Sequence, residues 1–338
     1  MAHRIFYYSD GGIGWEPIKH MIGIGLRVFN AQLIDLSKSQ PSFASRLRST
    51  LFHPPVGGEG GDIFIARRPH DLQYYFGHPS FLDKREFRAI WIIDSCFTEE
   101  WMKPTSRLLS YFDLVGYTQY RDSDFYSHLC GNRAVYLGWG TDALRISAIS
   151  SKRNIDILRV GRQPKEWDDD DQTAQACEAL SLTFQGRPPI VDDHRKSYED
   201  LIANWYSQSK VVIAHSNIVS PVFYGHVSKE YITARWADSL ACGAIVAGVQ
   251  PLQDIDLVNW DGALIHFDQI DLEENLLQIS EFLQNWSAKN AETNKLEALR
   301  RLDWRWRFDI IARRLECGTQ ILDHELSSLQ STIKILAQ

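Results

Sequence analysis

The sequence lacks several features that would each place it in a special class of protein. It has no run of about 18 apolar residues, the length that a membrane-spanning helix requires. Its five cysteines are an odd number, lie far apart and include no CxxC pair, which predicts reduced, buried thiols rather than a disulfide framework or a zinc site. It also has no low-complexity tract. With 44% hydrophobic and 23% charged residues, the sequence predicts a globular protein in a reducing compartment.

An excess of basic residues is also missing. The sequence has 36 Lys and Arg against 43 Asp and Glu, and the deficit lies in the second half: residues 1–150 hold 16 against 15, which leaves 20 against 28 for residues 151–338. Binding to a nucleic acid backbone needs a basic face, so nucleic acid is not expected as the main partner. The first ten residues, MAHRIFYYSD, do not show the charged and apolar regions of a signal peptide, which favours a cytoplasmic protein.

The length and the hydrophobic pattern indicate two α/β domains. A chain of 338 residues is long enough for about two domains. In both halves short apolar runs alternate with stretches of helix length, which is typical of parallel sheets covered by helices. A polar stretch at residues 147–154 marks the boundary, so we expect domains at 1–148 and 149–303, followed by helices over 304–338. The expected strands are residues 4–9, 31–36, 62–66, 88–94, 112–117, 134–137, 155–160, 210–215, 244–248 and 263–267, and one expected helix covers residues 198–208.

A short glycine-rich segment, Gly11-Gly12-Ile13-Gly14, separates the first expected strand from a helix that Pro17 can open. Glycines at this point let the backbone approach a phosphate or a sugar, and a helix N-terminus offers N–H groups to an anion. The segment does not fit the G-x-G-x-x-G fingerprint of dinucleotide-binding proteins, because Pro17 stands where its last glycine would be. A tight turn with no ligand explains these glycines equally well.

Two cations follow the first expected strand of the second domain, in the segment Val160-Gly161-Arg162-Gln163-Pro164-Lys165. Ligands of open α/β sheets bind outside the carboxyl ends of the strands, so Arg162 and Lys165 are placed to lie beside a diphosphate. Both residues are equally compatible with solvated charges in a linker.

Two carboxylates stand eight residues apart farther along the chain. Glu230 precedes an expected helix over residues 233–241, Asp238 lies inside it, and Gly243 ends it before a buried strand. The spacing alone allows an ordinary interpretation, in which Glu230 is a favourable charge at a helix N-terminus and Asp238 is a surface acid.

Residues 230–246 resemble the Glu-x7-Glu segment of GT-B glycosyltransferases, especially the large retaining, nucleotide-sugar-dependent family 4, with Asp238 in place of the second glutamate. Other segments resemble landmarks of that family and occur in the same order along the chain. The resemblance is best over about residues 133–315. It departs from the family at residues 221–229, which replace an extended glycine-rich donor loop. The resembling segments are residues 11–12, 138–142, 160–165, 211–216 and 303–307.

This resemblance implies a fold and an activity. The expected fold is GT-B: two Rossmann-like, doubly wound domains that face each other across a cleft, with C-terminal helices that cross back to the first domain. The expected reaction is transfer of a sugar from a nucleotide diphosphate sugar, a UDP- or GDP-sugar, to a glycan, a lipid-linked molecule or a small molecule, with retention and without a bound metal. Polysaccharide biosynthesis is the process that this activity would serve.

The resemblance also implies roles for individual residues of the donor site. Glu230 would contact hydroxyls of the donor sugar, Asp238 the ribose, and Arg162 and Lys165 the leaving diphosphate. Negative charge develops on the diphosphate as it departs, and two cations stabilise that charge. Further donor contacts are expected from Ser228, Lys229 and Gly12.

Acceptor contacts are expected from the first domain. Gly14, Trp15 and Asp10 lie in or beside the glycine-rich segment, His70 lies just past one expected strand of this domain, and Asp94 is the last residue of another. Asp94 and Asp10 are the acids best placed to act as a base if the reaction inverts, whereas a retaining reaction needs no dedicated base. A histidine at the end of a strand is more often structural than catalytic. Catalysis is therefore assigned to Glu230, with His70 and Asp94 as the further candidates.

Two other classes of protein remain as alternatives. A binding or scaffold protein with the same architecture could have lost catalysis. An oxidoreductase of the Rossmann type would need the dinucleotide fingerprint that residues 11–17 do not provide. We expect a cytoplasmic protein, with a peripheral contact to the inner face of the membrane through the first domain as an additional possibility.

Overall fold

The computed structural model describes residues 2–9, 11–38, 57–101, 106–146, 152–221 and 225–338. The chain divides into two compact units. Unit 1 comprises Met1–Gly138 and Arg305–Ser327, and unit 2 comprises Trp139–Trp304 and Ser328–Gln338. The domain boundary expected at residues 148 and 149 falls within 147–151, outside the described residues.

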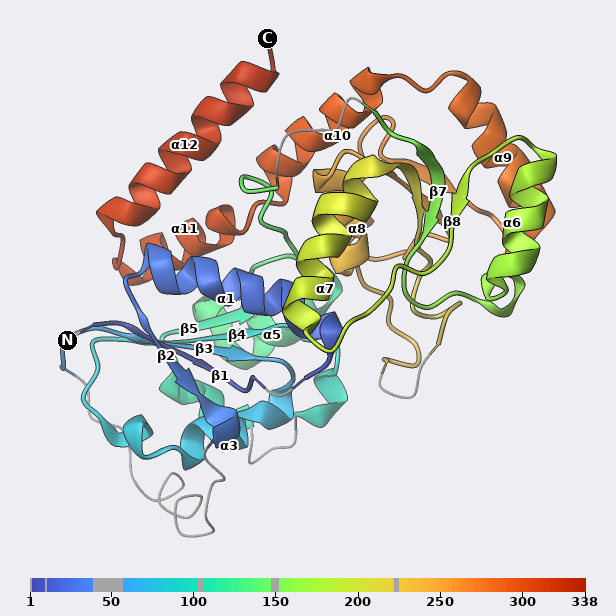
Figure 1. Ribbon diagram of the computed structural model, residues 1–338. Coiled ribbons are helices and arrows are strands. Elements are labelled where there is room, and N and C mark those ends of the chain that lie inside the picture. Colours follow the sequence, from blue (N-terminus) through green and yellow to red (C-terminus); the bar gives the residue numbers. More distant parts are fainter. Residues whose placement is uncertain (1, 10, 39–56, 102–105, 147–151, 222–224) are drawn as a thin grey trace. The chain divides into compact units, whose positions relative to one another are not determined.

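Unit 1 is built on a parallel sheet of six strands in the order β2-β1-β3-β4-β5-β6 (Figure 1). All of its strand pairs are parallel, as the alternation of apolar runs and helix-length stretches predicts. The strands are β1 (Arg4–Tyr7), β2 (Gln32–Asp35), β3 (Asp62–Ala66), β4 (Arg88–Ile92), β5 (Leu114–Tyr117) and β6 (Ala134–Tyr136). The helices of this part are α1 (Glu16–Val28), α3 (Leu72–Gly77), α5 (Ser123–Cys130), α11 (Trp304–Leu315) and the first part of α12 (Gln320–Leu336), which belongs to unit 2 from Ser328 on.

Helices cover both faces of this sheet. On one face, Tyr75 of α3 stacks on Phe64 of β3 with ring centroids 5.0 Å apart, and the same apolar cluster includes Tyr126 of α5. On the other face, Phe308 of α11 meets Trp91 of β4. Strands buried on both faces carry continuous apolar runs, which explains the composition of β3 and β4.

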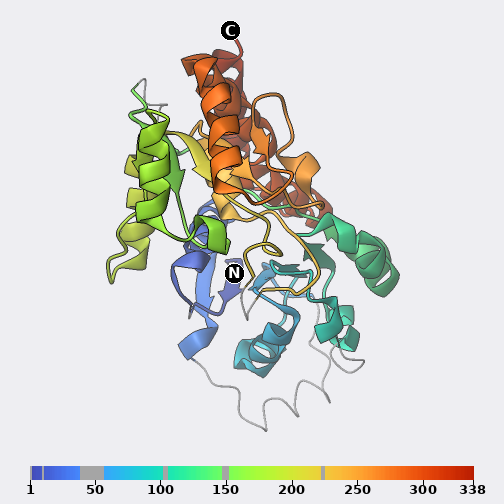
Figure 2. The same cartoon turned by 90° about the vertical axis from the view of Figure 1, so that its right-hand side faces the viewer.

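Unit 2 is built on a parallel sheet of five strands in the order β11-β10-β9-β7-β8. Helices α6 and α9 cover one face, and α8 with residues 201–208 covers the other; Figure 2 shows the unit from the side that carries α6. The strands are β7 (Ile155–Arg159), β8 (Phe184–Gln185), β9 (Ser209–Ile213), β10 (Ile245–Gly248) and β11 (Leu264–His266). The helices are α6 (Asp170–Ala179), α7 (His194–Asp200), α8 (Ala234–Ala241), α9 (Leu272–Gln284) and α10 (Ala288–Arg301).

The predicted fold class, with two parallel Rossmann-like sheets, is confirmed. The C-terminal helices also rejoin the first unit as predicted, since the ring of Phe308 lies 5.6 Å from that of Phe29 at the end of α1. The helix expected over residues 198–208 is wrong in detail. There α7 continues as a π-helical turn, Leu201–Trp205, and a 3-10 turn, Tyr206–Gln208. The two-residue strand β8 was not predicted, because two residues carry no periodic pattern.

The two stretches of chain that connect the units lie side by side within unit 2. Thr141 forms a parallel β-bridge with Asp303, its N–H donates to Leu302 O at 2.8 Å, and its carbonyl accepts from Trp304 N at 3.0 Å. Gly140 permits this approach, since a Cβ atom there would lie 2.5 Å from Leu302 O. The chain therefore leaves unit 1 and returns to it at the same place in unit 2.

The remaining features of the fold concern the cysteines, the lengths of the helices and the grouping of potential metal ligands. All five cysteines are buried thiols. Among the described residues, no helix is both long and apolar enough to cross a membrane. In the same part of the chain, no group of three or more His, Cys, Asp or Glu side chains is arranged to hold a metal ion.

Candidate functional site

The carboxylate of Glu230 is fixed at the carboxyl edge of the sheet of unit 2. Its Oε1 accepts a hydrogen bond from Ser216 Oγ at 2.5 Å, and its Oε2 accepts one from the backbone N–H of Leu252 at 2.9 Å. Ser216 follows β9 and Leu252 follows β10, so two neighbouring strands end at this half-buried carboxylate. Both partners are neutral donors, and a carboxylate has about four acceptor sites. Glu230 therefore keeps the capacity to accept further hydrogen bonds from a ligand's hydroxyl groups.

The loop before Glu230 is tied down by two side chains that the sequence did not single out. Asn217 Nδ2 donates to the carbonyls of His226 and Lys229 at 3.3 and 2.9 Å. The Nδ1 atom of His226 accepts from the backbone N–H groups of Ser228 and Lys229 at 3.1 and 3.0 Å. Of the predicted donor contacts, Ser228 is exposed and Lys229 is half-buried, and both lie on this loop beside Glu230.

The segment that carries the predicted diphosphate contacts leaves β7 through Gly161, whose φ of +69° is a conformation that favours glycine. Arg162 follows it, half-buried, and its Nη1 donates to Ser220 O at 3.1 Å. Arg235, in the first turn of α8, donates from Nη1 to Val160 O at 3.1 Å and to Arg162 O at 3.0 Å. The sequence did not single out Arg235, although it lies between the two predicted acids. It fixes the backbone that presents Arg162.

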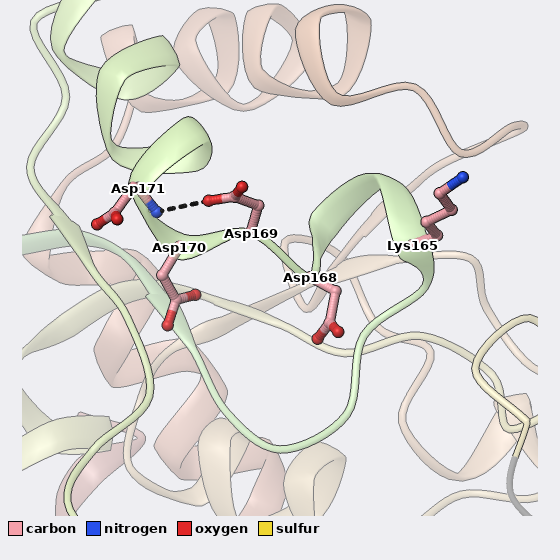
Figure 3. A pocket seen from close by; sticks show the side chains of 5 residues that line it. All are labelled: Lys165, Asp168, Asp169, Asp170 and Asp171. Carbon is pink, nitrogen blue, oxygen red and sulfur yellow. Dashed lines mark hydrogen bonds between the residues drawn. The ribbon is translucent and has the colours of Figure 1, made fainter.

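Lys165 lies farther along this segment and is exposed. It borders an open pocket of about 440 Å³, and Figure 3 shows its ammonium group pointing away from the acidic side chains there. No ion pair with Lys165 occurs among the described residues. Its charge is therefore accessible, but the pocket wall beside it is acidic. The other lining residues are Asp168, Asp169, Asp170 and Asp171.

Most of these acids have a structural task. The buried guanidinium of Arg159 forms ion pairs with Asp168 and Asp170, and Arg187 pairs with Asp168 at 2.5 Å. Asp169 caps α6, accepting hydrogen bonds at 3.0 Å from two backbone N–H groups of its first turn. The acidic pocket is thus the capped N-terminus of α6, and it does not suit a phosphate.

Asp238 lies in the core of unit 2 and is only 1% exposed. Its Oδ1 accepts from Thr141 Oγ1 at 2.6 Å, and its Oδ2 accepts from Tyr198 Oη at 2.9 Å. Burial raises the pKa of this carboxyl group to about 7, and the two hydroxyl donors offset only part of that effect. The structure thus places Asp238 beneath the surface, with both oxygens occupied by protein groups. The ribose contact that the resemblance implies for it stays a prediction.

In unit 1, the candidates His70 and Asp94 lie near one another at the carboxyl edge of the sheet. Asp94 follows β4, and the guanidinium of Arg68 lies 3.6 Å from its Oδ2. Burial nevertheless raises the pKa of Asp94 to about 6. His70 is about half exposed, with Nδ1 at 3.4 Å from Glu100 Oε2. A hydrogen bond to Glu100 raises the pKa of His70. Arg68 also lies 3.7 Å from Glu100, so the two candidates share one ionic cluster.

The glycine-rich segment of unit 1 has an open backbone. A Cβ atom at Gly12 or Gly14 would meet nothing within 4 Å, and both residues are exposed, whereas one at Gly11 would lie 2.8 Å from Trp15 Cδ1. Packing against the Trp15 side chain therefore requires a glycine at position 11, but not at position 12 or 14. Trp15 is half-buried, with the Arg67 guanidinium 5.8 Å from its ring. Asp10, the remaining acceptor candidate, lies outside the described residues.

Comparison with known proteins gives a match in structure alone. No protein-family model and no curated protein matches the sequence. Among solved structures, Anabaena Alr3699/HepE in complex with UDP and glucose matches with a TM-score of 0.55 and 12% identity, over 94% of this chain and 100% of that one. A glycosyltransferase from Rickettsia africae matches with a TM-score of 0.54 and 11% identity, over 93% and 99% of the two chains.

The chain has the GT-B fold. The predicted resemblance is thereby confirmed at the level of fold, over nearly the whole chain. A third structure, HepE in complex with UDP-glucose, matches with a TM-score of 0.51 and 13% identity, over 94% of this chain and 100% of that one. As a GT-B protein, the chain carries Glu230, Arg162 and Lys165 at the carboxyl edge of the second sheet, where ligands of open α/β sheets bind.

Proposed function

We propose that this GT-B protein transfers a sugar from a nucleoside diphosphate sugar, with retention and without a metal ion. The observation that carries the proposal is the environment of Glu230. Two neutral donors from loops after β9 and β10 orient its carboxylate at the ligand-binding edge of the sheet. Such a carboxylate suits the hydroxyl groups of a donor sugar.

The diphosphate would be held by Arg162 and Lys165, with Arg235 fixing the backbone of Arg162. As the bond between the sugar and the diphosphate breaks, negative charge develops on the leaving group, and these cations stabilise it. Ser228, Lys229 and Gly12 are proposed as further donor contacts. The complexes of HepE with UDP and with UDP-glucose make UDP-sugars the first donors to test.

The acceptor would be a glycan, a lipid-linked molecule or a small molecule bound by unit 1. Trp15 offers a ring beside the exposed backbone of Gly14, which suits stacking on a sugar face. Asp94, with a pKa raised to about 6, is suited to accept a proton from an acceptor hydroxyl if the reaction inverts. His70 lies in the same ionic cluster and is the second candidate for proton transfer there.

The test is a panel of nucleoside diphosphates followed by thermal unfolding. A ligand at 100 times its dissociation constant stabilises the protein by about 2.7 kcal/mol, so UDP or GDP should raise the unfolding temperature measurably. No shift with any nucleoside diphosphate would reject the proposal. Nucleotide binding without hydrolysis or transfer of any sugar would instead favour a GT-B binding or scaffold protein that lacks catalysis.

A further inference from the structure

We propose that Asn217 and His226 are positioning residues that hold the loop 226–229 ready for the donor sugar, in place of a glycine-rich loop. The inference rests on the function proposed above. The loop runs directly into Glu230, and its backbone is fixed by side chains from outside and inside the loop.

Asn217 acts from outside the loop. It follows Ser216 at the end of β9, is 5% exposed, and uses its amide N–H groups on two carbonyls of the loop, those of His226 and Lys229. A single buried amide thus joins the two ends of the loop. An amide that donates to two carbonyls is costly to remove, because both carbonyls lose their partner together.

His226 acts from inside the loop. It is 9% exposed, and its Nδ1 accepts from two successive backbone N–H groups, those of Ser228 and Lys229. An acceptor at Nδ1 requires the neutral ring with its proton on Nε2. Val227, between them, is 90% exposed, so apolar packing of this side chain does not hold the loop in place.

The hydrogen bonds of Asn217 to the loop lie next to the hydrogen bond that orients Glu230. Ser216 Oγ donates to Glu230 Oε1, while the adjacent Asn217 holds the carbonyl of Lys229, the residue before Glu230. Two consecutive residues after β9 therefore fix the last residue of the loop, Lys229, and the Glu230 that follows it. Ordering a loop at the moment of binding reduces affinity, and a loop ordered beforehand avoids that cost. Neither Asn217 nor His226 needs to touch the sugar.

The experiment compares binding of UDP with binding of the UDP-sugar that most stabilises the native protein, UDP-glucose being tried first, by titration calorimetry. Asn217→Asp removes both amide donors and keeps the size of the side chain. We expect its affinity for UDP to stay within about threefold of native. The additional affinity that the sugar confers should fall at least tenfold, and kcat for donor hydrolysis should fall with it.

The matched control is Asn294→Asp. Asn294 is fully buried on α10 and donates from Nδ2 to a backbone carbonyl, that of Ala244, at 3.0 Å, away from the loop. The Asn294→Asp variant should keep the additional affinity that the sugar confers over UDP. An equal loss in both variants would reduce Asn217 to a residue of general stability and overturn the proposal.

His226 provides a second pair of variants if Asn217→Asp does not fold. His226→Asn retains an acceptor near the position of Nδ1 and should keep most of the contribution of the sugar, whereas His226→Ala should lose it. An equal loss of this affinity in the two His226 variants would contradict the positioning role.

Failure of the native protein to bind any UDP- or GDP-sugar more tightly than the nucleotide would reject the proposed function, and this inference with it. A contribution that survives in Asn217→Asp would overturn this inference alone.

Discussion

The two ends of the segment from Glu230 to Asp238 differ more than their spacing suggests. Glu230 lies in a loop, half-buried, with donors from two strand ends close by in the sheet. Asp238 lies within α8, fully enclosed, with donors that come from Thr141 and Tyr198, 97 and 40 residues away in the chain. Two acids of one motif thus have opposite surroundings. The difference shows that the motif joins the carboxyl edge of the sheet to a polar contact inside the core.

The largest expected effect is on the rate of sugar transfer and comes from Glu230, at the loop end of the segment 230–238. Glu230→Ala should lower the rate of sugar transfer at least a thousandfold, about 4 kcal/mol of transition-state stabilisation, because the hydroxyl groups of the donor lose their charged acceptor. The loss of stability should stay within about 3 kcal/mol, the cost of leaving a buried donor without its acceptor, because Ser216 is only 1% exposed. The measurement is kcat/KM with thermal unfolding as the control. If the variant transferred sugar at the native rate, Glu230 would have no functional role and would not differ from Asp238 in this respect.

The next effect is at the core end and concerns stability. The folded-state pKa of Asp238, about 7, lies above its ordinary value of 3.8, so ionisation costs stability as the pH rises between those values. From pH 5 to pH 8 the native protein should lose on the order of 2 to 3 kcal/mol from this group, because about two pH units separate pH 5 from the folded-state pKa. Asp238→Asn should not show this loss. Urea unfolding at both pH values measures this change in the free energy of unfolding. An equal change in the native protein and in Asp238→Asn would show that Asp238 is not neutral in the fold.

A smaller effect is expected where α8 meets the segment after β7. Arg162→Ala should weaken binding of UDP about tenfold, or 1.4 kcal/mol, and leave binding of uridine unchanged, because only the diphosphate is charged. Arg195→Ala is the matched control: Arg195 is exposed and pairs with Glu199 one helical turn away. Calorimetry with both ligands makes the measurement. Equal losses for UDP and uridine would contradict the phosphate assignment of Arg162.

The smallest effect belongs to an exposed ion pair in unit 1. The pKa of His70 is raised by its hydrogen bond to Glu100, so its contribution to stability is present below the ordinary pKa of 6.5 and is lost as the pH rises through the higher folded value. Because half of this side chain is exposed, His70→Gln should change the unfolding free energy by less than about 1 kcal/mol. Unfolding at pH 6 and pH 8 tests this, and a larger change would assign His70 a structural role.

The sequence was sufficient for those features that local pattern controls. Strand β3 was predicted at its observed residues, 62–66, because strands buried on both faces are continuously apolar. Arg162 was predicted to lie at the edge of the sheet because it follows a recognisable strand, and Glu230 was singled out because it precedes a recognisable helix. The surroundings of Asp238 could not be predicted in this way, since its partners Thr141 and Tyr198 are distant in the chain. Asn217 was missed because a single amide has no pattern until its carbonyl partners are known.

The paired connections at Thr141 and Asp303 have a consequence for synthesis of the chain. Helix α11, whose Phe308 covers one face of the sheet of unit 1, is translated only after residues 139–304, which form nearly all of unit 2. Domains usually fold in the order of synthesis. Here the first sheet keeps part of one face uncovered while residues 139–304 are translated, so the five-stranded sheet of the second unit and its helices α6–α10 can form first.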